Sequence, residues 1–258
     1  MVVRMDLRLS GKKYLVTGAS RGLGFATAEA LVKEGAYVII CGRTEETLKV
    51  AAKTLGSKVR FVVADISQHE DIDRLLENIE TTEGILDGVF INAGGPPAGT
   101  LENLTEDEWE DSFNLVLMSV VRITRGAIPL LLGATSPSIL YNTSSSVKQP
   151  TKNYILANSL RTSVIGLMRT LADELGPIGI RINAICPGSF NTSPSGKTRI
   201  GLDDQNESLQ PQTEGIPLKR IGEPHEFGAV SAFLLSPVAS YIHGTLLLID
   251  GGKYRGSM

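Results

Sequence analysis

Three glycines near the N-terminus have the spacing that lets a backbone loop approach a phosphate group. They are Gly18, Gly22 and Gly24, and they follow the apolar run Tyr14–Thr17 and precede a segment of helical period. Glycine permits a tight strand-to-helix turn, and the N–H groups at the start of the helix then face an anion. A strand-to-helix turn also uses glycine for geometry alone, so the triplet by itself is weak evidence. In this position it predicts a pyrophosphate-binding loop.

Two arginines lie near the position expected for the adenosine ribose of a dinucleotide whose pyrophosphate binds this loop. Arg43 follows the apolar run Tyr37–Cys41, and Arg21 lies inside the glycine loop. An unphosphorylated ribose calls for an acidic residue at this strand end, and Cys41-Gly42-Arg43 contains none. Guanidinium groups bind phosphate through charge-assisted, often bidentate hydrogen bonds. The pair therefore predicts NADP as the cofactor, against the alternative that both arginines are only solvated.

The elements that hold these residues alternate between short β-branched runs and longer segments of helical period, as in a parallel sheet covered by helices. Asp65 follows the third run and Asn92-Ala93-Gly94 the fourth, at the carboxyl edge where open α/β sheets bind ligands. Two capping-box spacings, Ser67 with Glu70 and Thr105 with Glu108, predict helix starts. The expected strands are Tyr14–Thr17, Tyr37–Cys41, Val59–Ala64, Gly88–Ile91, Ser138–Asn142, Ile180–Ile185 and Thr245–Ile249.

This pattern predicts an α/β protein with a single-domain Rossmann fold, in which helices cover both faces of a doubly wound, seven-stranded parallel sheet. No linker, repeat or low-complexity tract divides residues 1–258, so one domain accounts for the chain. The long polar segment 193–217 is rich in Gly, Pro and Ser. It follows a strand near the carboxyl edge, so we expect either a substrate loop or a plain surface loop there.

Composition and charge exclude several other classes of protein. With 25 Lys and Arg against 28 Asp and Glu, the net charge is −3 and no basic stretch predicts nucleic acid as a partner. The two cysteines, Cys41 and Cys186, lie in apolar runs and are expected to be reduced core thiols, with no metal site. Neither a signal peptide nor an apolar run long enough for a bilayer is evident, so we expect a cytoplasmic protein without a membrane partner.

Together these motifs resemble the short-chain dehydrogenase/reductase family, above all its 3-oxoacyl-carrier-protein-reductase-like and sugar-dehydrogenase-like members. The family pattern Thr-Gly-x-x-x-Gly-x-Gly starts here at Thr17, and Asp65 and Asn92-Ala93-Gly94 match the motifs that follow it. The similarity continues through the segment 181–188 and Thr192 to Ile249-Asp250-Gly251-Gly252, so it covers nearly the whole chain. The resemblance implies these cofactor-binding residues: Gly18, Ser20, Arg21, Gly22, Leu23, Gly24, Asp65, Ile66, Asn92, Ala93, Gly94, Pro187, Gly188 and Thr192.

The same resemblance implies a serine, a tyrosine, a lysine four residues after it, and an asparagine in the preceding long helix. An ungapped alignment counted back from Pro187 places Arg161 at the lysine position and Ala157 at the tyrosine position. Val116 falls at the asparagine position, and α-helical geometry turns the nearby Asn114 away from it. Ser144, or its neighbour Ser145, keeps the serine; the alternative is a merely polar strand end.

Tyr154 is a possible replacement acid, because it stands four residues before Asn158. Its use requires a three-residue gap, which corresponds to about 4.5 Å of helix rise, and the alternative is a tyrosine packed at a helix start. Arg161 keeps a positive charge beside the cofactor ribose but does not relay protons, since the pKa of arginine lies above about 12. The tyrosine and lysine positions therefore depart from the family pattern.

Two functions follow from these expectations. The first is an NADP-dependent oxidoreductase that acts on a small carbonyl or secondary alcohol with an atypical catalytic set: Ser144 or Ser145, Tyr154 and Arg161. The second is an NADP(H)-binding protein without redox turnover, which acts as a sensor or an oligomer partner. The family also implies a homotetramer or a homodimer, paired through the apolar faces of the helices expected over 107–132 and 158–175.

Overall fold

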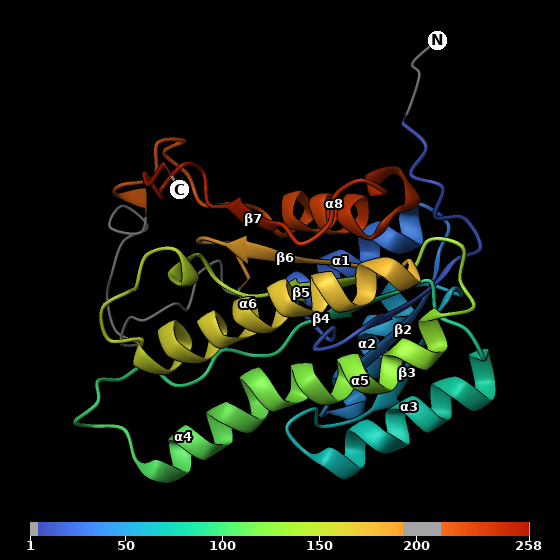
Figure 1. Ribbon diagram of the computed structural model, residues 1–258, viewed down its shortest axis with the longest axis horizontal. Helices are drawn as coiled ribbons and strands as arrows, with labels where there is room; N and C mark the ends of the chain where they lie inside the picture. The colour runs from blue at the N-terminus through green and yellow to red at the C-terminus, as the bar shows by residue number, and fades with distance from the viewer. Residues whose placement is uncertain (1–4, 193–212, 258) are drawn as a thin grey trace.

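The computed structural model describes residues 5–192 and 213–257. Within them, seven parallel strands form one sheet in the order β3-β2-β1-β4-β5-β6-β7, with helices on both faces (Figure 1). The chain crosses from β3 back to β4 on the other side of β1, which reverses the direction in which strands are added, so the carboxyl ends of β1 and β4 form the switch point where open α/β sheets bind ligands. The fold class expected from the sequence is confirmed. The strands are β1 Lys13–Val16, β2 Tyr37–Gly42, β3 Val59–Val63, β4 Gly88–Ile91, β5 Ser138–Asn142, β6 Arg181–Pro187 and β7 Leu246–Ile249.

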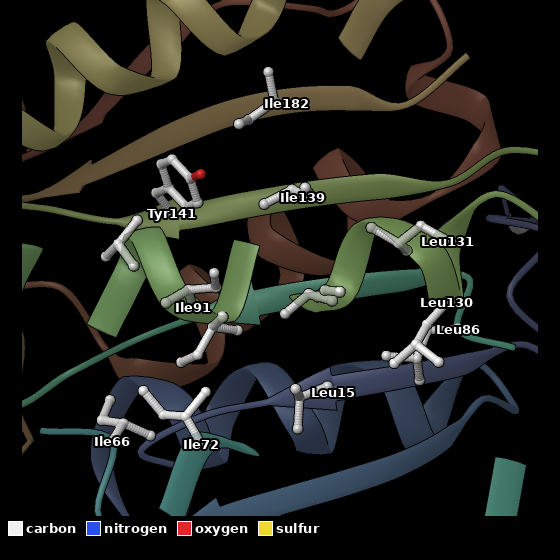
Figure 2. Close-up of a cluster of buried hydrophobic side chains, with 14 of the residues drawn as sticks. Leu15, Ile66, Ile72, Leu86, Ile91, Leu130, Leu131, Ile139, Tyr141 and Ile182 are labelled. Atoms are coloured by element: carbon white, nitrogen blue, oxygen red, sulfur yellow. The ribbon is translucent and has the colours of Figure 1, made fainter. Parts of the chain in front are cut away.

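Alternate residues of the strands feed two separate apolar layers. Leu15 packs with helices α3, α5 and α6 on one face, whereas its neighbours Tyr14 and Val16 pack with α1, α2 and α8 on the other. Figure 2 shows part of the first layer, with Leu15 and Ile139 from the sheet facing Leu131 of α5. The helices are α1 Gly22–Lys33, α2 Glu45–Leu55, α3 His69–Glu83, α4 Glu106–Phe113, α5 Ser119–Leu131, α6 Ile155–Leu175 and α8 Pro224–Leu235.

A five-residue π-helix, Asn114–Met118, joins α4 to α5. The sequence analysis assumed one regular α-helix over 107–132, and this assumption is wrong at the π turn. Together the three pieces form a continuous helical stretch from Glu106 to Leu131 that is long and apolar enough, by length and composition alone, to cross a membrane. Its apolar side is used in the protein, since Ile123, Ala127 and Leu131 are fully buried against the sheet.

One of the two predicted capping boxes forms. Thr105 Oγ1 accepts the N–H of Glu108, and the Glu108 carboxylate accepts the N–H of Thr105 (2.9 Å). The other prediction is wrong, because α3 begins at His69 rather than after Ser67. Ser67 instead donates its hydroxyl (2.8 Å) and its N–H (3.0 Å) to Asp65 Oδ1. The competing acceptor in the preceding turn therefore delays the start of the helix.

Arg181 fastens the end of α8 to the sheet. Its buried guanidinium donates to the carbonyl oxygens of Leu234 (3.0 Å), Ser236 (3.0 Å) and Ile242 (3.3 Å). These carbonyls lie at and beyond the end of α8, where helix carbonyls lack partners within the helix. Because a guanidinium is always charged and has no acceptor, three carbonyl oxygens suit it well.

We predict that Arg181→Met destabilises the protein by about 3 kcal/mol, since it leaves buried carbonyl oxygens without donors. Urea-induced unfolding measures the effect. Arg169→Met on the exposed side of α6 is the matched control, with an expected change below about 0.5 kcal/mol. Equal unfolding midpoints for the two variants would show that the Arg181 contacts contribute nothing.

Candidate active site

The glycine loop follows β1 and leads into α1. Gly18 and Gly22 have φ values of +56° and +63°, in the left-handed region that favours glycine. A Cβ on Gly24 would lie 2.4 Å from the carbonyl oxygen of Gly18 and 2.8 Å from Asn92 Nδ2. Thr192 lies beside the same loop, with its Cβ 3.7 Å from the position of a Cβ on Gly22. The loop is therefore built for close backbone approach at a strand-to-helix turn.

The loop also has the polarity for an anionic ligand. Arg21, the residue before α1, gives the helix no side-chain cap, so the first N–H groups of α1 are left for an outside acceptor. Arg21 and Arg43 are both exposed. The nearest acid after β2, Glu45, pairs with Lys49 (2.8 Å). A phosphorylated dinucleotide fits this donor set, because the backbone cradle and both exposed guanidinium groups offer donors, and the acid that follows β2 is already paired.

A pair of residues at the switch point ties β1 to β4. Thr17 Oγ1 donates to the carbonyl oxygen of Asn92 (2.8 Å), and the N–H of Asn92 donates back to Thr17 Oγ1 (2.7 Å). Asn92 Nδ2 also donates to the carbonyl oxygens of Thr17 (3.2 Å) and Gly18 (3.0 Å). The exposed Gly94, two residues later, has open space around it, since a Cβ there would meet nothing within 4 Å. Asn92 at the start of the Asn-Ala-Gly motif thus holds the glycine loop in place, and Gly94 at its end leaves open space.

The predicted adenine-side residues follow β3, which is two strands away from β1 in the sheet. Asp65 has its Oδ1 occupied by Ser67, and Ile66 is buried in the first apolar layer. Arg43 lines a cavity of about 440 Å³ that opens alongside. Its other lining residues are Ser67, Gln68, His69, Glu70, Asp111, Asn114, Leu115 and Arg122.

On the other side of the switch point, the expected serine follows β5. Ser144 precedes a 3-10 turn, Ser145–Val147, and its Oγ accepts the N–H of Ser146 (3.2 Å). Ser144 and Ser145 are both half-buried, whereas Ser146 is buried. Either of the two candidate serines is thus accessible to a small molecule, and the backbone turn fixes Ser144.

The positions expected for the tyrosine and the asparagine hold apolar side chains. Ala157 lies in the first turn of α6 and is 8% exposed. Val116 is buried against Leu156 and Leu160 of the same helix, while Asn114 lines the cavity of Arg43. Asn114 therefore lies away from the Val116 position, as expected, although through a π turn rather than a regular α-helix.

Tyr154 is the residue before α6, and its hydroxyl is buried without a hydrogen-bond partner. Burial raises the pKa of this phenol. The segment is held by Gly99, whose N–H donates to the carbonyl oxygen of Asn153 (2.7 Å). Asn158, which stands four residues after Tyr154, uses its side-chain amide to bind the backbone of Thr151 instead. The two residues therefore form no proton relay here.

Arg161 lies on α6 beside the carboxyl end of β5 and is only 8% exposed. Its Nη1 donates to the carbonyl oxygens of Thr143 (3.0 Å) and Asn142 (3.3 Å). Within residues 5–192 and 213–257, its Nε and Nη2 have no partner, and neither is among the fully buried atoms. Burial lowers the pKa of Arg161 to about 10, while the neighbouring Cys186 acts in the opposite direction. The guanidinium stays charged at neutral pH and has donors to spare.

Two residues that the sequence analysis did not single out connect these parts. Asn142 Nδ2 donates to Asn92 Oδ1 (2.7 Å), and its own Oδ1 is buried without a partner. Thr143 Oγ1 lies 2.8 Å from Cys186 Sγ, next to Pro187 and Gly188. A polar residue at the end of a central strand was the only sequence signal for Asn142. Through these contacts the ends of β1, β4, β5 and β6 form one polar row.

Comparisons with known proteins agree with this arrangement. The family described as Enoyl-(Acyl carrier protein) reductase matches residues 18–253. A 3-oxoacyl-[acyl-carrier-protein] reductase from Chlamydia muridarum is 34% identical over 96% of this chain and 99% of its own length. L-sorbose reductase from Gluconobacter frateurii, solved with NADPH and L-sorbose, is 30% identical, with a TM-score of 0.90 over 98% of this chain and 100% of that one.

A second solved structure has a similar fold. It is an NADPH-bound short chain oxidoreductase from Pseudomonas aeruginosa PAO1 that is described as containing an atypical catalytic center. This protein is 29% identical, with a TM-score of 0.87, and the match covers 95% of this chain and 98% of that one.

Proposed function

This chain belongs to the short-chain dehydrogenase/reductase family, and on that premise we propose that it is an NADP-dependent oxidoreductase with an atypical catalytic set. Its substrate is a small carbonyl compound or the corresponding secondary alcohol. The observation that carries the proposal is the polar row that runs from the glycine loop to the spare donors of Arg161. We assign the protein to the cytoplasm.

The cofactor end of this proposal rests on the glycine cradle and the two arginines. Gly18, Ser20, Gly22, Leu23 and Gly24 would hold the pyrophosphate and the adenosine ribose, while Arg21 and Arg43 would bind its 2′-phosphate. Asp65 and Ile66 would hold the adenine, and Asn92, Ala93 and Gly94 the bridge to the nicotinamide. Pro187, Gly188 and Thr192 would bind the carboxamide. When bound, reduced NADP supplies the hydride that converts a carbonyl carbon to an alcohol carbon.

At the reacting end, Ser144 or Ser145 would orient the carbonyl oxygen by a hydrogen bond. Arg161 would bind the nicotinamide ribose through its spare N–H groups and place a positive charge near the oxygen, where negative charge develops. The small side chain of Ala157 leaves room for a water molecule that delivers the proton to that oxygen. The buried phenol of Tyr154 is less suited to this step, because its hydroxyl has no accessible surface and proton transfer requires contact.

The loss of the tyrosine also favours the second candidate, an NADP(H)-binding protein without turnover. Removal of a general acid typically lowers a rate by a factor of about 10² to 10⁴ while cofactor binding persists. A titration of NADPH fluorescence beside an NADPH-consumption assay over a panel of ketones and aldehydes separates the two. Binding with consumption supports the oxidoreductase, and binding without consumption of any substrate supports the alternative.

We predict a preference of about 10-fold to 100-fold for NADP over NAD, the range expected for a charged hydrogen bond to the 2′-phosphate. Calorimetric titration with each cofactor measures it. Arg43→Ala is expected to remove most of the preference by weakening NADP binding alone, whereas Arg169→Ala on α6 leaves both affinities unchanged. Equal dissociation constants for NADP and NAD in the unaltered protein would contradict the assignment of NADP as the cofactor.

The catalytic positions generate another prediction. The prediction assumes that Ala157 and Arg161 occupy the family's tyrosine and lysine positions. In that case the double variant Ala157→Tyr, Arg161→Lys is expected to raise the rate of carbonyl reduction by at least about 10-fold, because a positioned general acid raises a rate by at least that factor. Tyr154→Phe then changes the rate by less than about twofold. Steady-state kinetics with the best ketone of the panel checks both variants. A loss of about 10²-fold in Tyr154→Phe, with no gain in the double variant, would make Tyr154 the acid instead.

We also propose a homotetramer, with a homodimer as its smaller alternative. Support comes from apolar side chains left exposed near the α4 and α6 side, among them Leu101 (72% exposed) and Phe113 (43% exposed). Light scattering at micromolar concentration is expected to give about four times the 27.6 kDa mass of one chain. A mass of one chain at that concentration would contradict assembly of either kind.

A further inference from the structure

Asn114 presents an unused side-chain amide to the cavity that Arg43 lines. The cavity has a volume of about 440 Å³, within the range of small-molecule pockets. Asn114 is half-buried, and within residues 5–192 and 213–257 its amide forms no hydrogen bond, although neither of its polar atoms is fully buried. By contrast, the amides of Asn92, Asn142 and Asn158 all bind other groups of the chain. The donors and the acceptor of Asn114 are therefore available to a ligand in the cavity.

The π turn separates the directions in which its residues face. The N–H of Ser119 donates to the carbonyl oxygen of Asn114, five residues earlier, and the hydroxyl of Ser119 donates to the carbonyl oxygen of Leu115 (2.6 Å). Val116 packs against α6, whereas Asn114 and Leu115 line the cavity. Isolated π turns are frequent at functional sites. Here the turn puts an amide and an apolar side chain on the same cavity wall.

The place of Arg43 indicates which part of the proposed cofactor lies beside this cavity. In the proposed function Arg43 binds the 2′-phosphate, and the 2′ oxygen belongs to the ribose that carries the adenine. The base therefore lies within one sugar ring of Arg43, close enough to enter the cavity. Ser67, which directly follows the proposed adenine-side residues Asp65 and Ile66, lines the same cavity. The adenine is thus the part of the cofactor that this cavity can hold.

The charges around the cavity suit an aminopurine better than a simple anion. Two cations, Arg43 and Arg122, and two carboxylates, Glu70 and Asp111, line it, and none of the four forms an ion pair in the part of the chain that the structure describes. The two signs balance, so an anion gains little there. The carboxylates and the Asn114 amide oxygen accept hydrogen bonds from an amino group, but they repel the oxygen of a 6-oxopurine.

We infer that Asn114 is a specificity-determining residue that reads the adenine base of the cofactor. Its Oδ1 would accept the N6 amino group and its Nδ2 would donate to the adjacent ring nitrogen, which is the bidentate pairing by which side-chain amides recognise adenine. This inference rests on the proposed function and adds to it a contact from the π turn. A bidentate pair of this kind discriminates against the wrong base by about 10-fold to 100-fold.

The test compares NADP⁺ with its hypoxanthine analogue, nicotinamide hypoxanthine dinucleotide phosphate. The two differ only at the 6-position of the base, where the analogue has an oxygen in place of the amino group and a protonated N1. Calorimetric titration of the unaltered protein with each gives the dissociation constants without any turnover. We expect NADP⁺ to bind about 10-fold or more tightly than the analogue.

Variants locate the effect. Asn114→Leu, which is similar in size but apolar, is expected to lower the affinity for NADP⁺ to within about threefold of that for the analogue. Asn114→Ser, which cannot form the bidentate pair, is expected to do the same and serves as a second variant if the first does not fold. The control is Asn78→Leu, an exposed amide on α3 outside the cavity, which is expected to keep the full preference. Asp65→Asn is also expected to keep it, since Asn114 reads the base.

The inference is overturned if the analogue binds as tightly as NADP⁺, or if the preference survives in both Asn114 variants. Equal weakening of NADP⁺ and analogue in these variants also overturns it, because Asn114 would then only shape the cavity. Loss of the preference in Asp65→Asn alone would assign the reading to Asp65. All these outcomes leave the proposed function intact as long as NADP⁺ binds more tightly than NAD⁺. Failure of NADP⁺ to bind would instead remove the proposed function, and the inference with it.

Discussion

One hydrogen-bonded row holds the candidate site together. It starts with Thr17 and Asn92, which bond reciprocally across β1 and β4, and it continues through Asn142 to the backbone oxygens that Arg161 binds. The bonds of Asn92 to Thr17 and to Asn142 cross from one parallel strand to its neighbour at the carboxyl edge, and those of Arg161 join the end of β5 to α6. Because the same Asn92 amide also binds the carbonyl oxygen of Gly18, the shape of the glycine loop and the position of Arg161 depend on one set of bonds.

The two buried arginines, Arg181 and Arg161, differ in how many of their donors are bonded within the chain. Arg181 uses both Nη1 and Nη2 on three carbonyl oxygens at and beyond the end of α8, and only its Nε is buried without a partner in the described residues. Arg161 spends only one nitrogen, on two carbonyl oxygens, and leaves the rest open. The unused donors of Arg161 are therefore available to a ligand at the expected reaction site.

Local patterns in the sequence predicted the parts of the site that depend on chain geometry. The glycine loop, the Asn92 turn and the doubly wound parallel sheet follow from residue type and spacing, since the topology of such a sheet brings these strand ends together. The packing of Tyr154 at the start of α6 was one of two predicted alternatives, whereas the start of α3 and the π turn at Asn114–Met118 were not predictable in this way. The start of α3 depends on a competing contact, the Asp65 acceptor for Ser67, that no spacing rule contains. The expected substrate loop 193–217 lies, in its segment 193–212, outside the described residues.

The central claim is that the spare donors of Arg161 replace the missing lysine beside a bound dinucleotide. A crystal structure of the protein with NADP⁺ tests it most directly. The account predicts that Nη1 stays on the carbonyl oxygens of Asn142 and Thr143, while Nε or Nη2 lies within hydrogen-bonding distance of a nicotinamide-ribose hydroxyl. A nicotinamide ribose bound elsewhere, or an Arg161 side chain turned to an acidic residue of its own chain, would contradict it.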